Sequence, residues 1–556
     1  MGIFNRTEWK IFFTFFIIYS LFAHTYGWSE ITRLDLTMAM VDDGSFSIDS
    51  YYQNTGDRAI IDGHYYSEKP PGISFLAVPV YTTYKFLFGI PTVGNELYAP
   101  LSKSFSVLMF LAIVFISALF GALSIVLLYK LSSYFVNKKE YKFLIILLYG
   151  LGTLIFVYSR SFIGHSVSTF FAFLSFYLLF LSKKKGKDHI FYAGLSAGFG
   201  VMAEYSVLII LSFSFLLAII YFKKRAWKYF MGFSIFLSLL LGYNYFITNN
   251  LAPVYSYADP YIWNDFVNCQ GQLSLDEKSF CDYLLTLDES NCYKITNNEL
   301  YNQCYFSYSF LEAENCQSIP FDSARNTCEA IRNKDCSYCS DINDSKLKGT
   351  CDFSCHGKSI IKVYIDKIFG NSKERAFIIM RVLFFPYRGL LFYYPILIFS
   401  IIGLFFMFKE YKYESIYIAL IFFGYLLYNS ILEVWWGGYA FGPRQLTPLM
   451  PFLMIPLLFS LKKIKLKYIL PFIVISLFFN FLSLQVPEEA GLGKEVVNFE
   501  AFGNPLFEHY LPKMVSDGPG NFLLQKAGLN IGGWTLVAIT ALACYFIWRK
   551  ELNSIL

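Results

Sequence analysis

Charge is scarce in this sequence. Of its 556 residues only 16% are charged, whereas a soluble globular chain usually carries about 25% charged residues. Apolar residues make up 55% and aromatic residues 20%, which excludes an intrinsically disordered chain. No internal repeat or low-complexity tract is present, so a fibrous protein is excluded too. The formal net charge is only +5 and the basic residues are scattered between apolar runs, which argues against a nucleic-acid-binding protein.

Long apolar runs take the place of charge. Residues Phe105 to Leu128 contain no charged side chain, and such a run is long enough to cross about 30 Å of hydrocarbon. Twelve apolar runs of this kind, some with a charged residue near one end, predict membrane spans. They cover residues 10–27, 103–129, 143–158, 165–181, 190–205, 206–222, 229–247, 389–408, 415–432, 446–461, 468–485 and 531–548. The run over 190–222 is too long for one span, and we divide it at Glu204-Tyr205. Residues 71–90 are apolar but interrupted by prolines, and they predict an interfacial helix.

Basic residues test this topology. If the N-terminus is cytoplasmic, the loops on that side hold 22 basic residues against six acidic ones. This matches the excess of lysine and arginine that marks cytoplasmic loops. We therefore predict an all-α integral membrane protein of the cell membrane with about twelve spans and both termini in the cytoplasm. The first span is expected to be an uncleaved anchor, although Ile11 to Ala23 also resembles the apolar part of a signal peptide.

The span count divides the chain into three parts. Residues 1–247 form an N-terminal transmembrane module whose first external loop covers 28–102. Residues 248–388 form an extracytoplasmic loop with a cysteine-rich insert at 269–355. Residues 389–556 form a C-terminal transmembrane module with an external loop at 486–530.

Cysteine is almost confined to that insert. Ten of the eleven cysteines lie there: Cys269, Cys281, Cys292, Cys304, Cys316, Cys328, Cys336, Cys339, Cys351 and Cys355. An even number of cysteines in a small extracytoplasmic insert predicts a subdomain stabilised by disulfides, although the spacing does not reveal the pairing. The competing interpretation is a metal site, because Cys336-x-x-Cys339 has zinc-like spacing.

Ionisable residues gather on the outer side. Glu30 and Arg33 follow the first span three residues apart, which places both on one face if the helix continues. The same loop adds Asp57, Asp62, His64, Tyr66, Glu68 and Lys69. Where other spans reach the outer face, the chain has Arg160, His165, Glu204, Tyr205, Arg388 and Arg444. Each of these residues alone fits a solvated linker or an interfacial anchor. Together they predict an outward-facing site for an anionic amphiphile, since the planar guanidinium donates two hydrogen bonds to a phosphate.

Several motifs resemble one enzyme family. They are SEITR, GHYYSEKPPGISFLAVPVY, FIGHSVSTFFAF, GLSAGFGVMAEYS, RGLLFYYPILI and WWGGYAFGPRQLTPLMPFL, in this order along the chain. The sequence resembles the polytopic glycosyltransferases of the GT-C class that use lipid-phosphate sugars. It is most similar to family 39, which contains protein O-mannosyltransferases and lipid A aminoarabinose transferases. The resemblance covers most of the chain outside the cysteine insert.

The resemblance implies a GT-C-like fold and an inverting transfer from an undecaprenyl- or dolichyl-phosphate sugar on the extracytoplasmic face. The acceptor is a glycan, a lipid or a protein. The family's acidic motif is often a pair of acids followed by an arginine; here Ser29 replaces the first acid, while Glu30 and Arg33 match. Glu30 is thus the first candidate for the catalytic base and Asp57 the second. Lys69 and Glu68 correspond to the family's K-P motif and its preceding acid. No cofactor is required by these residues, and a divalent metal stays open.

Two other functions compete with this interpretation. Twelve spans also suit a secondary transporter or a lipid flippase, but the outward loops are unequal and the spans lack charges near their midplanes. A surface-binding scaffold that uses the cysteine-rich insert is the second alternative. The ordered motifs outside the insert favour an enzyme.

Overall fold

The fold is taken from a computed structural model. The structure describes residues 4–24, 27–61, 63–92, 102–257, 372–432, 435–438, 440–485, 503–520, 522–526, 528–529 and 531–552, and six single residues between 258 and 371. All ten cysteines of the predicted insert lie outside the described residues, so the predicted disulfides concern residues that the structure does not describe. Asp62 also lies outside the described residues. Cys544 is half-buried in the last helix as a free thiol.

The described chain is mostly helical. In the N-terminal half the helices are α1 (Arg6–Leu21), α2 (Trp28–Asp42), α3 (Gly72–Phe88), α4 (Lys103–Ala112), α5 (Leu119–Ser132), α6 (Lys139–Leu151), α7 (Leu154–Tyr158), α8 (Gly164–Lys185), α9 (Ile190–Ala203), α10 (Leu208–Phe222) and α11 (Trp227–Thr248). In the C-terminal half they are α17 (Ser372–Phe384), α18 (Leu390–Tyr393), α19 (Ile398–Phe408), α20 (Lys412–Ile431), α21 (Met450–Lys463), α22 (Leu466–Phe481), α24 (Leu511–Asp517), α25 (Leu523–Lys526) and α26 (Gly533–Leu552). One short hairpin pairs β1 (Arg58–Ile61) with β2 (His64–Ser67).

Short 3-10 and π segments link or extend these helices. They are η1 (Tyr52–Asn54), η2 (Ile113–Ala118), η3 (Tyr205–Val207), η4 (Lys223–Ala226), η5 (Val254–Tyr257), η9 (Pro395–Leu397), η10 (Arg444–Leu449), η11 (Leu482–Gln485) and η12 (Leu506–Tyr510). The π segment η2 joins α4 to α5, so that 103–132 is one continuous apolar helix.

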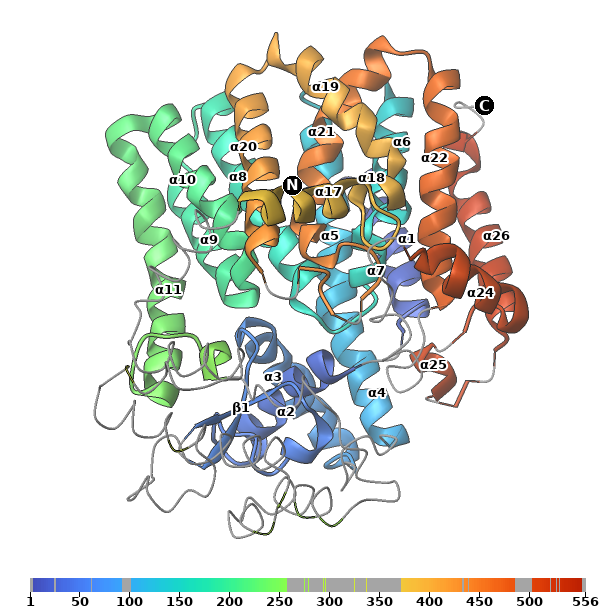
Figure 1. The fold of residues 1–556 in the computed structure, drawn as a ribbon. Helices are drawn as coiled ribbons and strands as arrows, with labels where there is room; N and C mark the ends of the chain where they lie inside the picture. The colour runs from blue at the N-terminus through green and yellow to red at the C-terminus, as the bar shows by residue number, and fades with distance from the viewer. Residues whose placement is uncertain are drawn as a thin grey trace. The chain divides into compact units, whose positions relative to one another are not determined.

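The chain forms two compact units. Unit 1 holds 1–56, 67–254 and 373–556, and unit 2 holds 57–66 and 255–372. In unit 1, α8 to α11 and α20 lie on one side, α1, α6, α22 and α26 lie on the other, and α5 and α21 pass between them (Figure 1). Helices α2 and α3 pack on each other, and α3 also packs against α4. The start of α2 carries Glu30 and Arg33 of the site described below.

Among the described residues, six helical stretches are long and apolar enough to cross a membrane: Lys103–Ser132, Gly164–Lys185, Tyr205–Thr248, Lys412–Ile431, Arg444–Lys463 and Leu466–Gln485. Three shorter apolar helices cover Ile190–Ala203, Pro395–Phe408 and Gly533–Arg549. The predicted class, an all-α membrane protein, agrees with these helices. A break at Glu204, whose backbone is extended, confirms the predicted division of 190–222, and α3 confirms a helix within 71–90.

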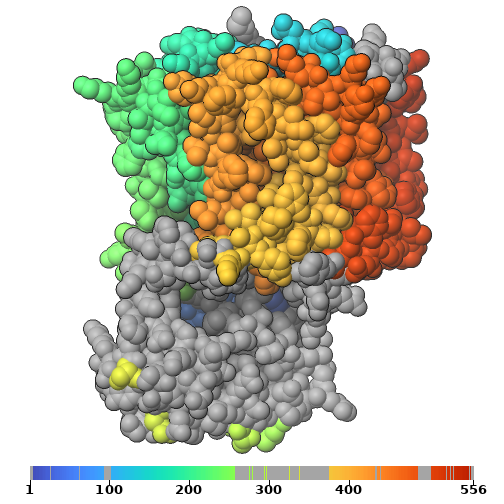
Figure 2. All heavy atoms as spheres, turned by 45° about the horizontal axis from the view of Figure 1, so that its top comes forward, coloured from blue at the N-terminus to red at the C-terminus, as the bar shows by residue number. Residues whose placement is uncertain are grey.

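Apolar side chains cover the outside of unit 1. The face formed by α19, α20 and α22 is shown in yellow to orange in Figure 2. Phe405 on α19 is 74% exposed and Phe423 on α20 is 66% exposed. Large exposed apolar side chains on long helices are suited to contact with lipid rather than water.

The first predicted span differs from the structure. Helix α1 ends at Leu21 and a new helix begins at Trp28, so Glu30 and Arg33 lie on α2 and not on a continuation of the first helix. The Phe22 N–H still donates to the Ile18 carbonyl oxygen of α1, but the Phe22 carbonyl oxygen accepts from the Arg160 guanidinium and the His24 N–H donates to the Arg160 carbonyl oxygen. Glu30 and Arg33 still share one face, because they are three residues apart within α2.

Glycines allow α9 and α11 to pack at backbone contact. A Cβ atom on Gly194 would lie 1.9 Å from the Tyr229 carbonyl oxygen, and one on Gly232 would lie 2.2 Å from the Phe191 carbonyl oxygen. Small residues on facing helices permit such close approach in membrane proteins. Gly242, also on α11, has no atom within 4 Å of such a Cβ.

We expect Gly194→Ala to lower the melting temperature of the detergent-solubilised protein. The added methyl group meets backbone that must move, at a cost of about 1–3 kcal/mol. Gly242→Ala is the matched control, because both variants gain the same helix propensity, about 1 kcal/mol. Equal or higher melting temperatures for both variants relative to wild type would show that the helices are not in backbone contact here.

Candidate functional site

Glu30 lies in the first turn of α2 and is buried, with 7% of its surface exposed. Its Oε2 accepts a hydrogen bond of 3.2 Å from the backbone N–H of Gly27. Its Oε1 accepts one from the hydroxyl of Ser161, which belongs to the turn between α7 and α8. Burial raises the pKa of the Glu30 carboxyl above its ordinary value, and the Ser161 hydrogen bond and the Arg33 charge offset only part of this effect.

Arg33 and His165 both face Glu204. Arg33 Nη2 lies 3.8 Å from Glu204 Oε2, and His165 Nδ1 lies 3.8 Å from the same oxygen. Arg33 is also held by Ser29, whose hydroxyl oxygen accepts from Arg33 Nη1 at 2.6 Å. Positive charges of Arg444 and Lys69 act on the Glu204 carboxylate as well. One carboxylate is therefore surrounded by three cationic side chains and a histidine.

Two glycines bring the chain close to Glu204. A Cβ atom on Gly72, after the KPP segment, would lie 2.5 Å from the Met202 carbonyl oxygen. A Cβ atom on Gly164, before His165, would lie 2.4 Å from the Ala203 carbonyl oxygen and 2.9 Å from Glu204 Oε2. Only glycine permits this approach of backbone to backbone. The first residues of α3 and α8 are thereby fixed beside the end of α9.

Two glycines of the GGYAFGPR segment, Gly437 and Gly438, lie close to Arg444. Gly437, Gly438 and Gly442 have φ angles of +80°, +65° and +61°, a region that favours glycine. A Cβ atom on Gly437 would lie 3.1 Å from Arg444 Cγ. Arg388, which is 1% exposed, donates to the carbonyl oxygens of Trp436 at 3.1 Å and Gly438 at 3.3 Å. Arg388 thus positions the backbone that surrounds Arg444.

Tyr158 links this segment to α8. Its hydroxyl donates a 2.8 Å hydrogen bond to the Phe441 carbonyl oxygen, and its ring meets the His165 ring edge-on, with centroids 5.2 Å apart. Charges of Arg444, Arg388 and Glu30 all act on Tyr158. The structure therefore brings together segments from α2, α3, α8, α9 and the 436–444 turn, and these segments carry the motifs noted in the sequence.

Lys69 forms an ion pair with its neighbour Glu68, which is 2% exposed. Lys69 itself is half-buried. Since Lys69 also acts on Glu204, it lies on the cationic side of the site. Tyr205 follows Glu204 as the first residue of η3 and is half-buried.

Arg160 has different surroundings from the other predicted binding residues. It is fully buried, and its guanidinium donates to the carbonyl oxygens of Phe156 at 2.9 Å, Phe22 at 3.2 Å and Ser483 at 3.2 Å. It also donates to the Ser483 hydroxyl at 3.0 Å. These bonds tie the α1–α2 link to the end of α22. They favour a structural role for Arg160 rather than the predicted contact with substrate.

We expect Arg160→Met to lower the melting temperature strongly, because each buried carbonyl left without a donor costs about 1–3 kcal/mol. Arg549→Met, at an exposed position on α26, should leave the melting temperature unchanged. If Arg160→Met instead melts like wild type but no longer binds undecaprenyl phosphate, Arg160 is a binding residue after all.

Three predicted site residues belong to unit 2. Asp57 is buried there, Tyr66 is half-buried and His64 is exposed. In the same hairpin the Arg58 guanidinium lies 4.6 Å from the centre of the Tyr65 ring. Asp62 lies outside the described residues. The site described here is confined to unit 1.

Sequence reasoning missed Ser161, Asp35 and Asp42. Asp35 is fully buried in α2 and accepts a 3.0 Å hydrogen bond from Asn54, and burial raises its pKa well above the usual range. Asp42 accepts hydrogen bonds from Tyr51, Tyr81 and Lys85, which join the far ends of α2 and α3. Acids separated by seven residues in the apolar stretch after Arg33 were an available signal for this polar face of α2.

The arrangement offers a buried carboxylate at Glu30 beside Arg33, and a group of cations that acts on Glu204. Such a site can accept a proton at Glu30 and bind an anion at the cations. No group of three or more His, Cys, Asp or Glu side chains that could hold a metal ion occurs within the described part of the chain. Neither a known protein family nor any curated protein sequence matches this chain.

Proposed function

We propose that this protein is an integral-membrane glycosyltransferase that moves a sugar from a polyprenyl-phosphate donor to an acceptor. The observation that carries the proposal is the buried carboxylate of Glu30 beside Arg33. Arg33 in turn faces Glu204, the carboxylate on which the charges of Lys69 and Arg444 also act. A transfer from a lipid-phosphate sugar needs one base for the acceptor and several cations for the departing phosphate.

The chemistry is a single displacement at the anomeric carbon. The acceptor hydroxyl or amine attacks this carbon while Glu30 takes its proton, which explains the need for an ionised carboxylate that is held in place by Ser161 and Gly27. The bond from the anomeric carbon to the phosphate oxygen breaks, and its electron pair leaves with the polyprenyl phosphate. Because attack is opposite the leaving phosphate, the anomeric configuration inverts.

The leaving phosphate gathers negative charge as the bond breaks. Lys69, Arg33 and Arg444 are suited to stabilise it, and their mutual repulsion is reduced by Glu204 when no phosphate is present. His165, 3.8 Å from Glu204, is suited to donate a hydrogen bond to the same phosphate. Arg388 acts through the 436–438 backbone as a positioning residue.

The membrane setting belongs to the same proposal. In this proposal the chain has twelve spans and both termini in the cytoplasm, and the start of α2 faces the extracytoplasmic side, where a lipid-linked donor is delivered. The apolar helices of unit 1 provide the lipid-facing surface that a polyprenyl chain requires.

Donor turnover in proteoliposomes tests the proposal. Purified protein is given a panel of undecaprenyl- and dolichyl-phosphate hexoses and pentoses, and release of the free polyprenyl phosphate is measured. We expect release from at least one donor, faster when an acceptor extract is added. Protein that moves lipid across the bilayer but never releases polyprenyl phosphate from any donor would favour a flippase and contradict the proposal.

The dependence of turnover on pH below neutrality tests the ionisation of Glu30. The base must be ionised, so turnover should fall as pH drops through the raised pKa of Glu30. Ser161→Ala removes a hydrogen bond that lowers this pKa, and the fall should therefore begin at higher pH. Ser159→Ala, a buried serine in the same turn, is the control and should leave the profile unchanged. An identical profile for wild type and Ser161→Ala would remove Glu30 as the titrating base.

A further inference from the structure

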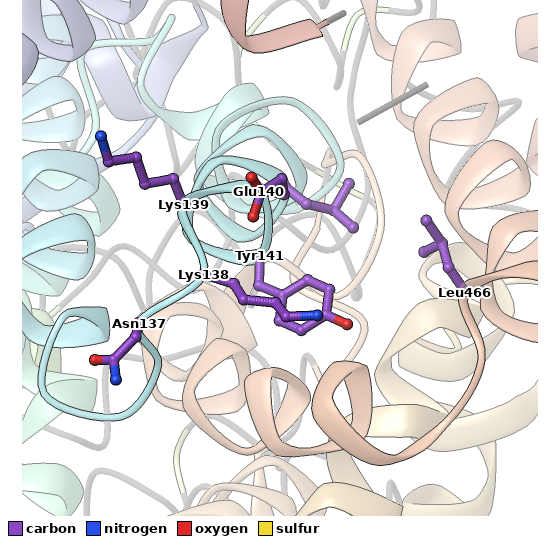
Figure 3. A pocket seen from close by; sticks show the side chains of 7 residues that line it. Asn137, Lys138, Lys139, Glu140, Tyr141 and Leu466 are labelled. Atoms are coloured by element: carbon purple, nitrogen blue, oxygen red, sulfur yellow. The ribbon is translucent and has the colours of Figure 1, made fainter. Parts of the chain in front are cut away.

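A second polar region lies at the junction of α5 and α6. A cavity of about 710 Å³ is lined by Asn137, Lys138, Lys139, Glu140, Tyr141, Leu144 and Leu466. Figure 3 shows that the lysine and tyrosine side chains come from the start of α6, and that Leu466 faces them from the start of α22. The cavity belongs to the lysine-rich side that the sequence predicts to be cytoplasmic.

Positive charge exceeds negative charge among the described residues at this cavity. Two lysines and one glutamate line it, and Lys142 lies one turn further along α6. Within the described chain, none of these three lysines forms an ion pair with a carboxylate; Lys138 packs over the Tyr141 ring and Lys142 approaches the Ser133 hydroxyl. Other lysines and arginines on this side do pair with acids: Lys10 with Glu551, Lys130 with Glu8, Arg225 and Lys228 with Asp188, and Lys462 with Glu410.

The pKa of Lys142 also indicates excess positive charge at this cavity. Partial burial and the neighbouring Lys139 charge lower the pKa of its ammonium group. An anion near the start of α6 would relieve this repulsion, and the unsatisfied N–H groups of a 13-residue helix would add to the attraction.

The lining also has an apolar half. Leu144, Leu466 and the Tyr141 ring line the cavity together with the lysines. A ligand that fits both halves is an amphiphile with an anionic head. Cavities of this size hold small ligands, and basic pockets between transmembrane helices on the cytoplasmic side bind anionic lipid headgroups.

We propose that this cavity binds the phosphate headgroup of an anionic phospholipid, with Lys138 and Lys139 as its charged contacts and Leu144 and Leu466 beside the start of its acyl chains. The site is separate from the proposed reaction and does not depend on it. Its expected effect is stabilisation of the folded protein by anionic lipid.

Thermal unfolding in a neutral detergent tests the proposal. Short-chain phosphatidylglycerol should raise the melting temperature at concentrations where phosphatidylcholine of the same chain length does not. Lys138→Ala/Lys139→Ala should weaken the phosphatidylglycerol effect by about tenfold in concentration. Lys183→Ala/Lys184→Ala, exposed lysines at the end of α8 that do not line the cavity, should change it less than about twofold. Leu466→Trp keeps all charges but fills the cavity, and it should weaken the effect as well.

Three results would overturn the proposal. Equal weakening by the two lysine pairs would mean general attraction to a basic surface. An equal effect of phosphatidylcholine would remove the role of the anionic head. An equal effect of inorganic phosphate alone would mean that the site takes a free anion rather than a lipid. The melting temperature of each variant without lipid shows that it is folded.

Discussion

Glu30→Gln should reduce sugar transfer by about 10²- to 10⁴-fold, the contribution expected of a positioned general base. Glutamine has nearly the same shape and can still accept from Ser161, but it cannot take a proton from the acceptor. It also removes a buried charge, so the fold is expected to persist. Because Glu30 acts on the acceptor, affinity for undecaprenyl phosphate should stay close to that of wild type. The measurement is polyprenyl phosphate release at saturating donor, together with the inhibition constant of undecaprenyl phosphate.

Asp35→Asn is the matched control for this variant. It removes another buried carboxylate from the same helix and keeps an oxygen that can accept from Asn54. Transfer should be retained in Asp35→Asn. Asp57→Asn distinguishes the second candidate base: an inactive Asp57→Asn beside an active Glu30→Gln would assign the proton transfer to Asp57.

Lys69→Ala should reduce transfer by about 10²- to 10³-fold, the range reported for removal of one group that stabilises developing negative charge. Here the loss should include affinity, because Lys69 is proposed to contact the phosphate itself. Inhibition by undecaprenyl phosphate should therefore weaken in Lys69→Ala but not in Glu30→Gln. This opposite behaviour separates the proposed cation from the proposed base.

Lys69→Ala removes an ion pair from the buried Glu68, and a weakened pairing of a buried charge destabilises a fold. The double variant Glu68→Gln/Lys69→Met removes both charges and should lose transfer while it melts close to wild type. Lys85→Met is the control lysine on α3, since Asp42 keeps its hydrogen bonds from Tyr51 and Tyr81. Full transfer in the double variant would remove Lys69 from the site.

The sequence predicted the long helices well because their signal is simple. A span such as 103–132 needs only an uninterrupted apolar run, and the break at Glu204 follows from a chain too long for one span. The break after α1 was not predicted, because residues 22–27 contain no proline and no Asp, Glu, Lys or Arg that would mark the end of the apolar run. What ends α1 is a distant contact: Arg160 bonds to the Phe22 carbonyl oxygen across 138 residues of chain.

The candidate site was predicted residue by residue but not as a geometry. Glu30, Arg33, His165 and Glu204 were named from their types and their place at span ends, and the structure brings them together. The role of Arg160 could not be read in this way, since a buried arginine that bonds carbonyl oxygens has the same sequence signature as one that binds phosphate. Ser161 was missed because a serine becomes informative only when its partner is known.

A structure with undecaprenyl phosphate bound tests the central claim most directly. The account predicts the phosphate within hydrogen-bond distance of Lys69 and of Arg33 or Arg444, close to Glu204 and His165, with the Glu30 carboxylate facing the space where the sugar and acceptor meet. The polyprenyl chain should run along the apolar helices of unit 1. A phosphate bound away from these cations, with Glu30 facing only protein, would contradict the account.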